Sequence, residues 1–233
     1  PGAKVMAEAP VIFLAFDLLE WEDEDWRVRP LTERRQRLLD MLHAIAGGTR
    51  FRATSPLPAA TWEGLALARA QSREHGTEGL MLKRASSPYG VGRPRGDWWK
   101  WKIEPYTLDA VLIYAQKGHG KRASLYTDYT FGLWNGGELV PFAKAYSGLD
   151  DAEIREVDAF VRANTLERFG PVRVVKPELV FELGFEAIQR SKRHKSGIAV
   201  RFPRMLRMRK DKAPSQANTV DDARELAGWE NAA

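Results

Sequence analysis

The strongest restriction on the fold comes from a series of short strand-like segments in the second half of the chain, beyond Pro105. Turns at residues 117–120 and 135–137 separate several of them, and one helical segment, residues 150–163, interrupts the series. Several short strands with glycine-containing turns and a single helix are typical of a small β-barrel. The strand-like segments are residues 109–115, 123–134, 139–146, 172–175, 179–185 and 198–208.

The first half of the chain has a different pattern. It mixes apolar runs of strand length with longer segments of helical periodicity. The change of pattern places a domain boundary near residues 104–107, so the sequence predicts an α+β protein with domains at residues 1–104 and 105–233. In the first domain we expect a buried strand at residues 11–19, a turn or hairpin at 21–29, helices at 32–46 and 60–74, strands at 78–84 and 98–103, and a loop at 86–96.

The overall charge favours a polyanionic partner such as nucleic acid. The formal net charge is +5 and the sequence pI is about 9.5, although a basic protein without an anionic partner fits that charge as well. The chain has no cysteine, which excludes disulfides, thiolate metal sites and cysteine nucleophiles. No apolar stretch approaches the ~18 residues of a membrane span, and no signal segment opens the chain. We expect a cytoplasmic protein with no membrane partner.

Two lysines in the segment WWKWK indicate a phosphate-binding strand. Side chains alternate along a strand, so Lys100 and Lys102 share one face while Trp99 and Trp101 point the other way, into a core. Neighbouring ammonium groups repel each other, and a phosphate between them would relieve that repulsion. The alternative is a half-exposed strand with a lysine face.

A carboxylate begins the preceding strand-like segment, EGLMLKR. Glu78 there could present its carboxylate to a hydrated Mg²⁺, with Gly79 allowing close approach of the backbone. A single glutamate at the start of a strand is also ordinary surface.

Basic residues are concentrated near the C-terminus. Between Arg190 and Lys212 there are ten lysines or arginines and one acid. If the end of this segment is extended, Arg207, Arg209 and Asp211 share a face, and the arginines could bind a triphosphate or a DNA backbone bidentately. The alternative is a basic tail with non-specific affinity for nucleic acid. The basic turn KGHGKR could contact phosphates or be a plain hairpin turn.

These segments, taken in order, resemble the ATP-dependent DNA ligases of the nucleotidyltransferase superfamily. FDLL at residues 16–19 with PLTERRQRL resembles motif IIIa, and EGLMLKR resembles motif IV. WWKWK resembles motif V, and RFPRMLRMRKDK resembles motif VI. The resemblance implies the C-terminal part of a nucleotidyltransferase (adenylation) domain with a mostly antiparallel sheet, followed by an OB-fold barrel.

The resemblance also implies roles for individual residues. Phe16 is expected to stack on the adenine and Glu78 to bind Mg²⁺. Lys100 and Lys102 are expected to hold the α-phosphate of ATP and of the covalent AMP intermediate. The motif VI residues Arg209, Asp211 and Lys212 are expected to orient the β- and γ-phosphates. The residues expected to bind DNA are Lys117, Lys121, Arg122, Arg201 and Arg204.

The resemblance implies an enzyme, most simply monomeric, that seals nicks in duplex DNA through enzyme-adenylate and DNA-adenylate intermediates. Such ligases attack ATP with the lysine of a KxDG motif, and these 233 residues contain no KxDG. We therefore expect no self-adenylation by this chain alone, and a ligase N-terminal part carrying KxDG as its partner. The alternatives are a DNA-binding clamp without catalysis, or a related RNA ligase or capping enzyme.

Overall fold

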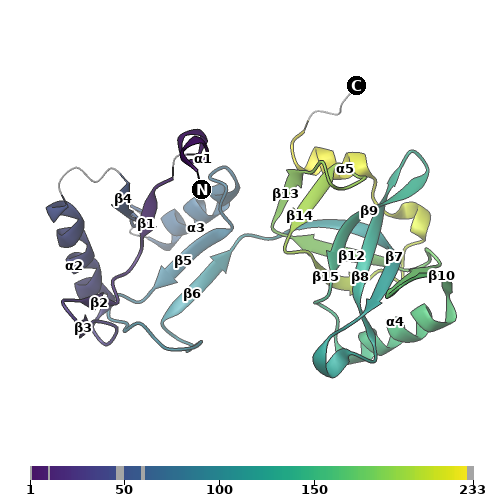
Figure 1. The fold of residues 1–233 in the computed structure, drawn as a ribbon, viewed down its shortest axis with the longest axis horizontal. Helices are drawn as coiled ribbons and strands as arrows, with labels where there is room; N and C mark the ends of the chain where they lie inside the picture. The colour runs from purple at the N-terminus through teal and green to yellow at the C-terminus, as the bar shows by residue number, and fades with distance from the viewer. Residues whose placement is uncertain (1, 10, 46–49, 59–60, 230–233) are drawn as a thin grey trace. The chain divides into compact units, whose positions relative to one another are not determined.

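A computed structural model, which describes residues 2–9, 11–45, 50–58 and 61–229, divides the chain into two compact units (Figure 1). Unit 1 is Pro1–Ile103 and unit 2 is Glu104–Ala233. Helices occur in both units, and most of the strand pairs are antiparallel. The prediction of an α+β fold with a mostly antiparallel sheet is therefore confirmed.

The described residues of unit 1 form helices and three small strand pairs. Of these pairs, the one formed by β1 (Phe13–Ala15) and β4 (Phe51–Ala53) is parallel. β5 (Gly79–Lys83) and β6 (Trp98–Lys102) form the antiparallel pair that carries the predicted motifs. The remaining elements are α1 (Ala3–Glu8), β2 (Glu20–Trp21), β3 (Glu24–Asp25), α2 (Leu31–Ala44), α3 (Trp62–Ala70) and the 3₁₀ turn η1 (Gln71–Arg73).

The apolar run at residues 11–19 is not the buried strand that its hydrophobicity predicts. Only Phe13–Ala15 pair as a strand, and Phe13 is 62% exposed, whereas Leu18 is buried. Among the residues that the structure describes, β4 is the single strand that pairs with β1. A strand covered by few neighbours keeps its side chains in solvent however apolar they are, so the prediction of burial was wrong.

The helices of unit 1 are shorter than predicted. The predicted end of the first at Ala46 and the predicted start of the second at Ala60 lie outside the described residues. α3 begins after Thr61, whose hydroxyl accepts a hydrogen bond from the Gly64 N–H at 3.1 Å, as a helix cap does. Its last turn tightens into η1 and does not continue to residue 74.

Unit 2 is built on a curled seven-stranded sheet (Figure 1). β7 (Tyr106–Lys117) is its central strand and pairs with β8, β11 and β12, which explains why β7 is buried along most of its length. A short β13–β14 pair lies outside this sheet. The other strands are β8 (Tyr126–Asn135), β9 (Glu138–Ala145), β10 (Thr165–Phe169), β11 (Val172–Val175), β12 (Val180–Phe185), β13 (Ala187–Arg190), β14 (Ile198–Arg201) and β15 (Arg204–Met208).

Local sequence signals account for most connections in unit 2. The predicted turn between β8 and β9 is present, with Gly136 and Gly137 both at positive φ. The predicted strand at residues 198–208 is broken, because Phe202 adopts φ +52° and Pro203 has no N–H to donate. β10 was not predicted. Helices α4 (Asp151–Ala163) and α5 (Val220–Leu226) begin with capping boxes at Asp150 and Thr219, and short 3₁₀ turns occur at Gly120–Arg122 and Pro214–Gln216.

Aromatic side chains fill the core of unit 2. Phe131 lies edge-on to Phe181 with ring centroids 5.3 Å apart, and Phe142 lies edge-on to Phe185 at 5.7 Å. All four rings are buried. Burial of each such side chain contributes about 1.5–3 kcal/mol relative to exposure, so unit 2 has the core of an independent domain.

Asp158 joins α4 to β8, and its loss should destabilise unit 2. Its buried carboxylate accepts a hydrogen bond from the Tyr126 N–H at 2.9 Å and one from Arg162 Nε at 2.7 Å. Burial alone would raise the pKa of Asp158, but these hydrogen bonds outweigh burial and hold the pKa below its ordinary value. We expect Asp158→Ala to lower the free energy of unfolding at neutral pH by about 2–3 kcal/mol.

The pH dependence of the same variant provides a second readout. The folded pKa of Asp158 lies below the unfolded value of about 3.9, so its contribution is present above pH 4 and is lost as the pH falls through the folded pKa. Urea unfolding should therefore show a smaller difference in the free energy of unfolding between wild type and Asp158→Ala near pH 3 than at pH 7. Glu156→Ala, at an exposed ion pair of the same helix, is the control. Equal losses of unfolding free energy in Asp158→Ala and Glu156→Ala would contradict the role of Asp158 in joining α4 to β8.

Candidate functional site

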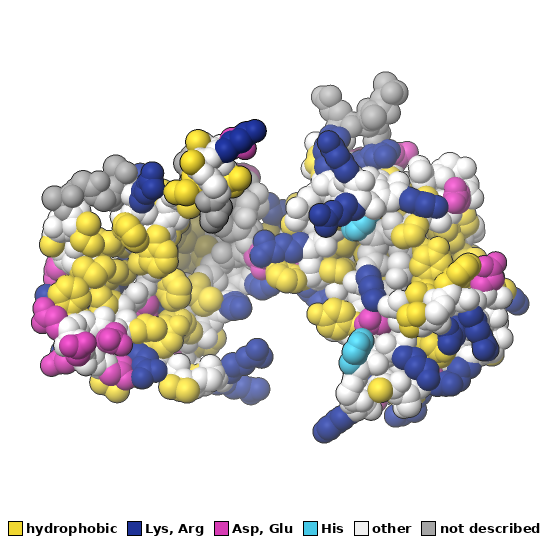
Figure 2. Space-filling model, viewed as in Figure 1, with side chains coloured by type: hydrophobic (Ala, Val, Ile, Leu, Met, Phe, Trp, Pro, Cys, Tyr) yellow, Lys and Arg dark blue, Asp and Glu magenta, His cyan; other side chains and the backbone are white. Residues whose placement is uncertain are grey.

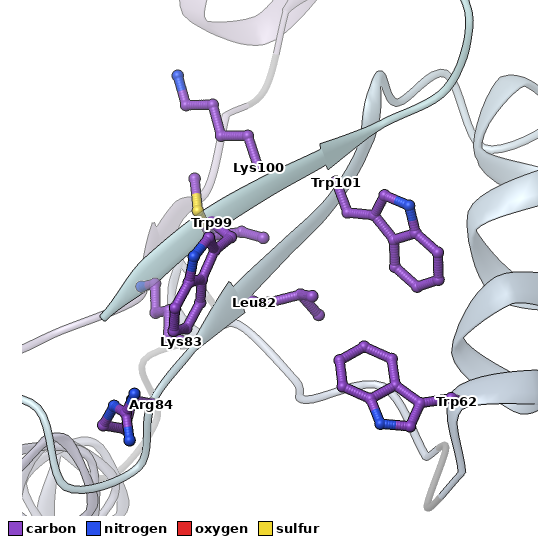
Figure 3. Close-up of a pocket in the computed structure, with 8 residues that line it drawn as sticks. Trp62, Leu82, Lys83, Arg84, Trp99, Lys100 and Trp101 are labelled. Carbon is purple, nitrogen blue, oxygen red and sulfur yellow. The ribbon is translucent and has the colours of Figure 1, made fainter. Parts of the chain in front are cut away.

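The β5–β6 pair places the two predicted phosphate-binding lysines on an exposed face. In the antiparallel register, Met81 is opposite Lys100 and Gly79 is opposite Lys102. Figure 3 shows Lys100 and Trp101 leaving opposite sides of β6, as strand alternation requires. Within the described part of the chain, Lys100 forms no ion pair, so its ammonium is available to an anion.

Glu78 and Lys102 are brought together across this pair of strands. Glu78 Oε2 and Lys102 Nζ are 3.0 Å apart. The close approach depends on Gly79, which has φ +135° and where an added Cβ would lie 2.4 Å from the Trp101 carbonyl oxygen. The predicted metal ligand and a predicted phosphate ligand are therefore neighbours.

A single carboxylate limits the metal chemistry available at Glu78. Among residues 2–9, 11–45, 50–58 and 61–229, no cluster of three or more His, Cys, Asp or Glu residues could hold a metal ion. Mg²⁺ in proteins is commonly bound through one or two carboxylates together with substrate phosphates. Glu78 therefore fits a metal that is shared with a bound nucleotide.

Phe16 contacts a lysine that the sequence did not single out. The ammonium of Lys83 lies 4.5 Å from the centre of the Phe16 ring and 4.1 Å from that of Trp98, within the range of cation–π attraction. Burial lowers the pKa of Lys83. Register across β5 and β6 places Lys83 opposite Trp98, so pairing the two segments in the sequence would have revealed this contact.

The tryptophans of β6 do not point into a core, contrary to the prediction. Trp99 is 45% exposed, and Trp101 is half-buried and meets Trp62 edge-on at 6.0 Å. An open pocket of about 790 Å³ borders the strands (Figure 3), and its lining includes Trp62, Leu82, Trp99, Lys100 and Trp101. In unit 1 this largely apolar face is left in solvent.

Unit 1 also exposes apolar side chains other than these tryptophans. Figure 2 shows hydrophobic side chains gathered over the part of unit 1 where β1 and β4 lie. Soluble monomers rarely expose contiguous apolar patches larger than a few hundred Å², so this surface fits a protein contact. We call these exposed side chains, which lie on both faces of β1 and near β4, the unit 1 apolar surface: Val11, Ile12, Phe13, Leu14, Phe51 and Leu57.

In unit 2, the predicted motif VI residues form one ion cluster. Arg209 is held by Asp211 on one side, with Nη2–Oδ2 at 2.8 Å, and by Asp109 on the other, with Nη1–Oδ2 at 2.9 Å. Lys212 also binds Asp109. Hydrogen bonds from Arg209 hold the pKa of Asp211 well below its usual range, and those from Asp211 raise the pKa of Arg209. Arg209 and Asp211 therefore both stay charged at physiological pH.

Asp109 is the part of this cluster that sequence reasoning missed. It lies on β7, the central strand, and is buried. Its only sequence signal is one acid inside an apolar run, which the strand pattern treats as an outward-facing position. The partner cations lie about a hundred residues away in sequence, so only the folded sheet brings the groups together.

The residues predicted to contact DNA lie in two places on unit 2. Lys117, Lys121 and Arg122 are at the end of β7 and in the loop after it, where Arg122 also binds Asp151 at 2.8 Å. Arg201 ends β14, with its guanidinium 4.9 Å from the Phe202 ring. Arg204 begins β15 and binds Glu186 at 2.9 Å.

None of the helices in the part of the chain that the structure describes has the length and apolar character of a membrane span.

Comparison with known families gives two matches. Residues 2–102 match the ATP dependent DNA ligase domain, and residues 122–212 match the ATP dependent DNA ligase C terminal region. The two matches lie in unit 1 and unit 2 respectively and together include nearly all of the candidate residues.

Individual relatives agree with the family matches. A probable DNA ligase of Koribacter versatilis is 39% identical over 252 residues, covering 97% of this chain and 42% of the relative. A DNA ligase of Methanoculleus marisnigri is 34% identical over 224 residues, covering 96% of this chain and 40% of the relative. The chain thus spans about two fifths of the length of these relatives.

Solved structures agree on the fold. A Lig E DNA ligase, described as binding DNA with a minimal scaffold, has a TM-score of 0.59 at 20% identity and covers 85% of this chain and 63% of that chain. The two family matches and the sequence relatives lead to one conclusion: the chain belongs to the ATP-dependent DNA ligase family.

Proposed function

We propose that this chain forms part of an ATP-dependent DNA ligase that seals nicks between a 3′-hydroxyl and a 5′-phosphate in duplex DNA. In this proposal unit 1 holds the adenylate and unit 2 supplies motif VI and DNA contacts. The observation that carries the proposal is the exposed β5–β6 face, where Lys100 and the Glu78–Lys102 pair converge. Fixed cations on such a face stabilise charge developing on phosphorus.

The roles within the site follow from position and charge. Lys100 and Lys102 would contact the α-phosphate, and Phe16, whose ring lies beside Lys83, would stack on the adenine. Bound Mg²⁺ would neutralise phosphate charge, with Glu78 as its protein ligand. Phosphate binding at Lys102 would compete with its ion pair to Glu78, which would free the carboxylate for the metal.

Arg209, Asp211 and Lys212 would act as a preorganised group. The two acids that hold Arg209 fix its guanidinium in one orientation, and a fixed cation loses little entropy when it binds a triphosphate. In this proposal Arg209 and Lys212 bind the β- and γ-phosphates, while Asp109 and Asp211 orient them.

We infer that unit 1 works with a second ligase segment that carries KxDG. The sequence has no KxDG, and the unit 1 apolar surface offers a large contact for such a segment. Burial of that surface would contribute about 25 cal/mol per Å² of apolar area. The segment would supply the lysine nucleophile that attacks ATP.

The first test uses the intact mass of this chain before and after incubation with ATP and Mg²⁺. We expect no AMP adduct, because the nucleophile lies in the partner segment. A chimera that adds the remaining part of the Koribacter versatilis relative to this chain should gain one AMP and seal a nicked duplex. An adduct on the chain alone would contradict the need for a partner, and an inactive but folded chimera would contradict the assignment as a ligase.

A second candidate, a DNA clamp without catalysis, is favoured by the absence of KxDG. The same experiment separates the two: a clamp predicts that the chimera binds nicked DNA but neither gains AMP nor seals. An RNA ligase or capping enzyme would be distinguished by sealing of nicked RNA or by labelling with GTP.

A further inference from the structure

The loop between β13 and β14, residues 191–197, is the most basic exposed segment that the proposed site does not use. Lys192, Arg193 and Lys195 are exposed, and none of them forms an ion pair within the part of the chain that the structure describes. Figure 2 shows Lys and Arg side chains at the end of unit 2 where β13, β14 and α5 lie. Three cations within four residues repel one another unless an anion lies among them.

The loop is held in one conformation by its own hydrogen bonds. The Ser191 N–H donates to the Gly197 carbonyl at 2.8 Å, and the Gly197 N–H donates to the His194 carbonyl at 2.9 Å. His194 Nδ1 lies 2.6 Å from the carbonyl oxygen of Ile198, and Ser196 is buried. A loop whose backbone is fixed in this way presents its cations without the entropy cost of ordering the backbone on binding.

The loop also lies at the opposite end of the barrel from the other basic loop. Phe185, just before β13, pairs with Tyr106 at the start of β7, whereas the loop containing Lys121 and Arg122 follows the end of β7 at Lys117. A strand of 12 residues spans at most about 40 Å. One turn of B-DNA is about 34–36 Å, so a duplex a little longer than one turn is long enough to reach both loops.

We propose that the β13–β14 loop is a second DNA-backbone contact of unit 2, in which Lys192, Arg193 and Lys195 bind duplex phosphates within about one helical turn of the Lys117–Arg122 end. This inference rests on the proposed function, because it takes duplex DNA as the partner. It extends that function by assigning DNA contacts to residues outside the motifs.

The test measures binding of this chain to a fluorescent nicked duplex of 30 base pairs as a function of salt concentration. The binding constant falls as salt rises, and each lost phosphate contact makes the slope of log K against log salt less negative by about 0.9. We expect the double variant Arg193→Gln, Lys195→Gln to make the slope less negative by about 1.8 and to weaken binding at low salt.

The matched control is Arg168→Gln, Lys176→Gln, which removes the same net charge from exposed positions on β10 and after β11. We expect the control to keep the wild-type slope within about 0.5, and both variants to keep the wild-type melting temperature. Equal slopes for the loop variant and wild type would overturn the inference while leaving the proposed function intact. Absence of DNA binding by the wild-type chain and by the chimera would overturn both.

Discussion

Replacement of Lys100 by alanine is expected to lower nick sealing by the chimera about 10²- to 10³-fold. Lys100 is the exposed cation of β6 that has no ion pair within the described residues, so its charge is not already neutralised by the protein. The reaction transfers an adenylyl group and places extra negative charge on phosphate oxygens. Removal of the cation from that position removes stabilisation that appears only as the charge develops.

The measurement should separate the steps of the reaction. We expect the rate of AMP adduct formation, followed by intact mass in a single turnover, to fall together with the rate of sealing. Lys144→Ala is the control, because Lys144 is an exposed strand lysine in unit 2 that is paired with Asp128 at 2.9 Å. Undiminished adduct formation and sealing by the Lys100 variant, beside an unaffected control, would show that Lys100 does not bind the reacting phosphate.

Lys102→Ala should differ from Lys100→Ala in one respect. Loss of Lys102 also releases Glu78 from its ion pair, so the dependence of activity on Mg²⁺ concentration should change for Lys102→Ala but not for Lys100→Ala. This comparison tests whether the Glu78 carboxylate is the metal ligand.

The local parts of the site could be predicted from the sequence, because they depend on strand alternation. Lys100 and Lys102 share a face of β6 for the same reason that any residues i and i+2 do, and Asp211 lies beside Arg209 because the two are close in the chain. Contacts between strands were harder. The Glu78–Lys102 and Lys83–Trp98 contacts depend on the register of β5 against β6, which no single segment specifies.

Long-range features escaped prediction for two physical reasons. Asp109 meets Arg209 only because β12 lies beside β7 and the chain returns from β15 across the sheet. The run at residues 11–19 was predicted to be buried because its hydrophobicity is high. Burial also needs neighbouring elements to cover the run, and β1 has one strand partner within the described part of the chain. Hydrophobicity indicates that a surface needs a partner and does not say where that partner is.

Replacement of Arg34 by methionine is expected to lower the free energy of unfolding of unit 1 by about 3–5 kcal/mol. Arg34 lies on α2. Its side chain is 0% exposed, and the side chain of Asp17 is 2% exposed. Arg34 Nε and Nη2 bind Asp17 at 2.8 and 2.9 Å, and Nη1 donates to the Ser87 carbonyl at 3.0 Å and to that of Arg29. The variant leaves the Asp17 carboxylate buried without its cation.

This ion pair also connects the parts of unit 1 that carry the proposed site. Asp17 follows Phe16 in the chain, and Ser87, which follows β5, accepts a hydrogen bond from Trp98 Nε1 at 3.0 Å. Loss of Arg34 should therefore loosen Phe16 and Trp98, the two rings that enclose the Lys83 ammonium. Arg34→Lys, which keeps the charge but not the bidentate geometry, should fall between wild type and Arg34→Met.

Urea unfolding followed by tryptophan fluorescence can measure the effect on unit 1, because six of the eight tryptophans precede residue 104. The control is Arg27→Met, which breaks a bidentate ion pair with Asp25 in which both side chains are 50% exposed. Because solvent screens such a pair, the unfolding midpoint of Arg27→Met should stay near that of wild type. The double variant Arg34→Met, Asp17→Leu removes both buried charges and should recover much of the loss. Equal midpoints for Arg34→Met and Arg27→Met would contradict a structural role for the buried pair, whereas a large loss that Asp17→Leu reverses would show that the unpaired carboxylate is its cause.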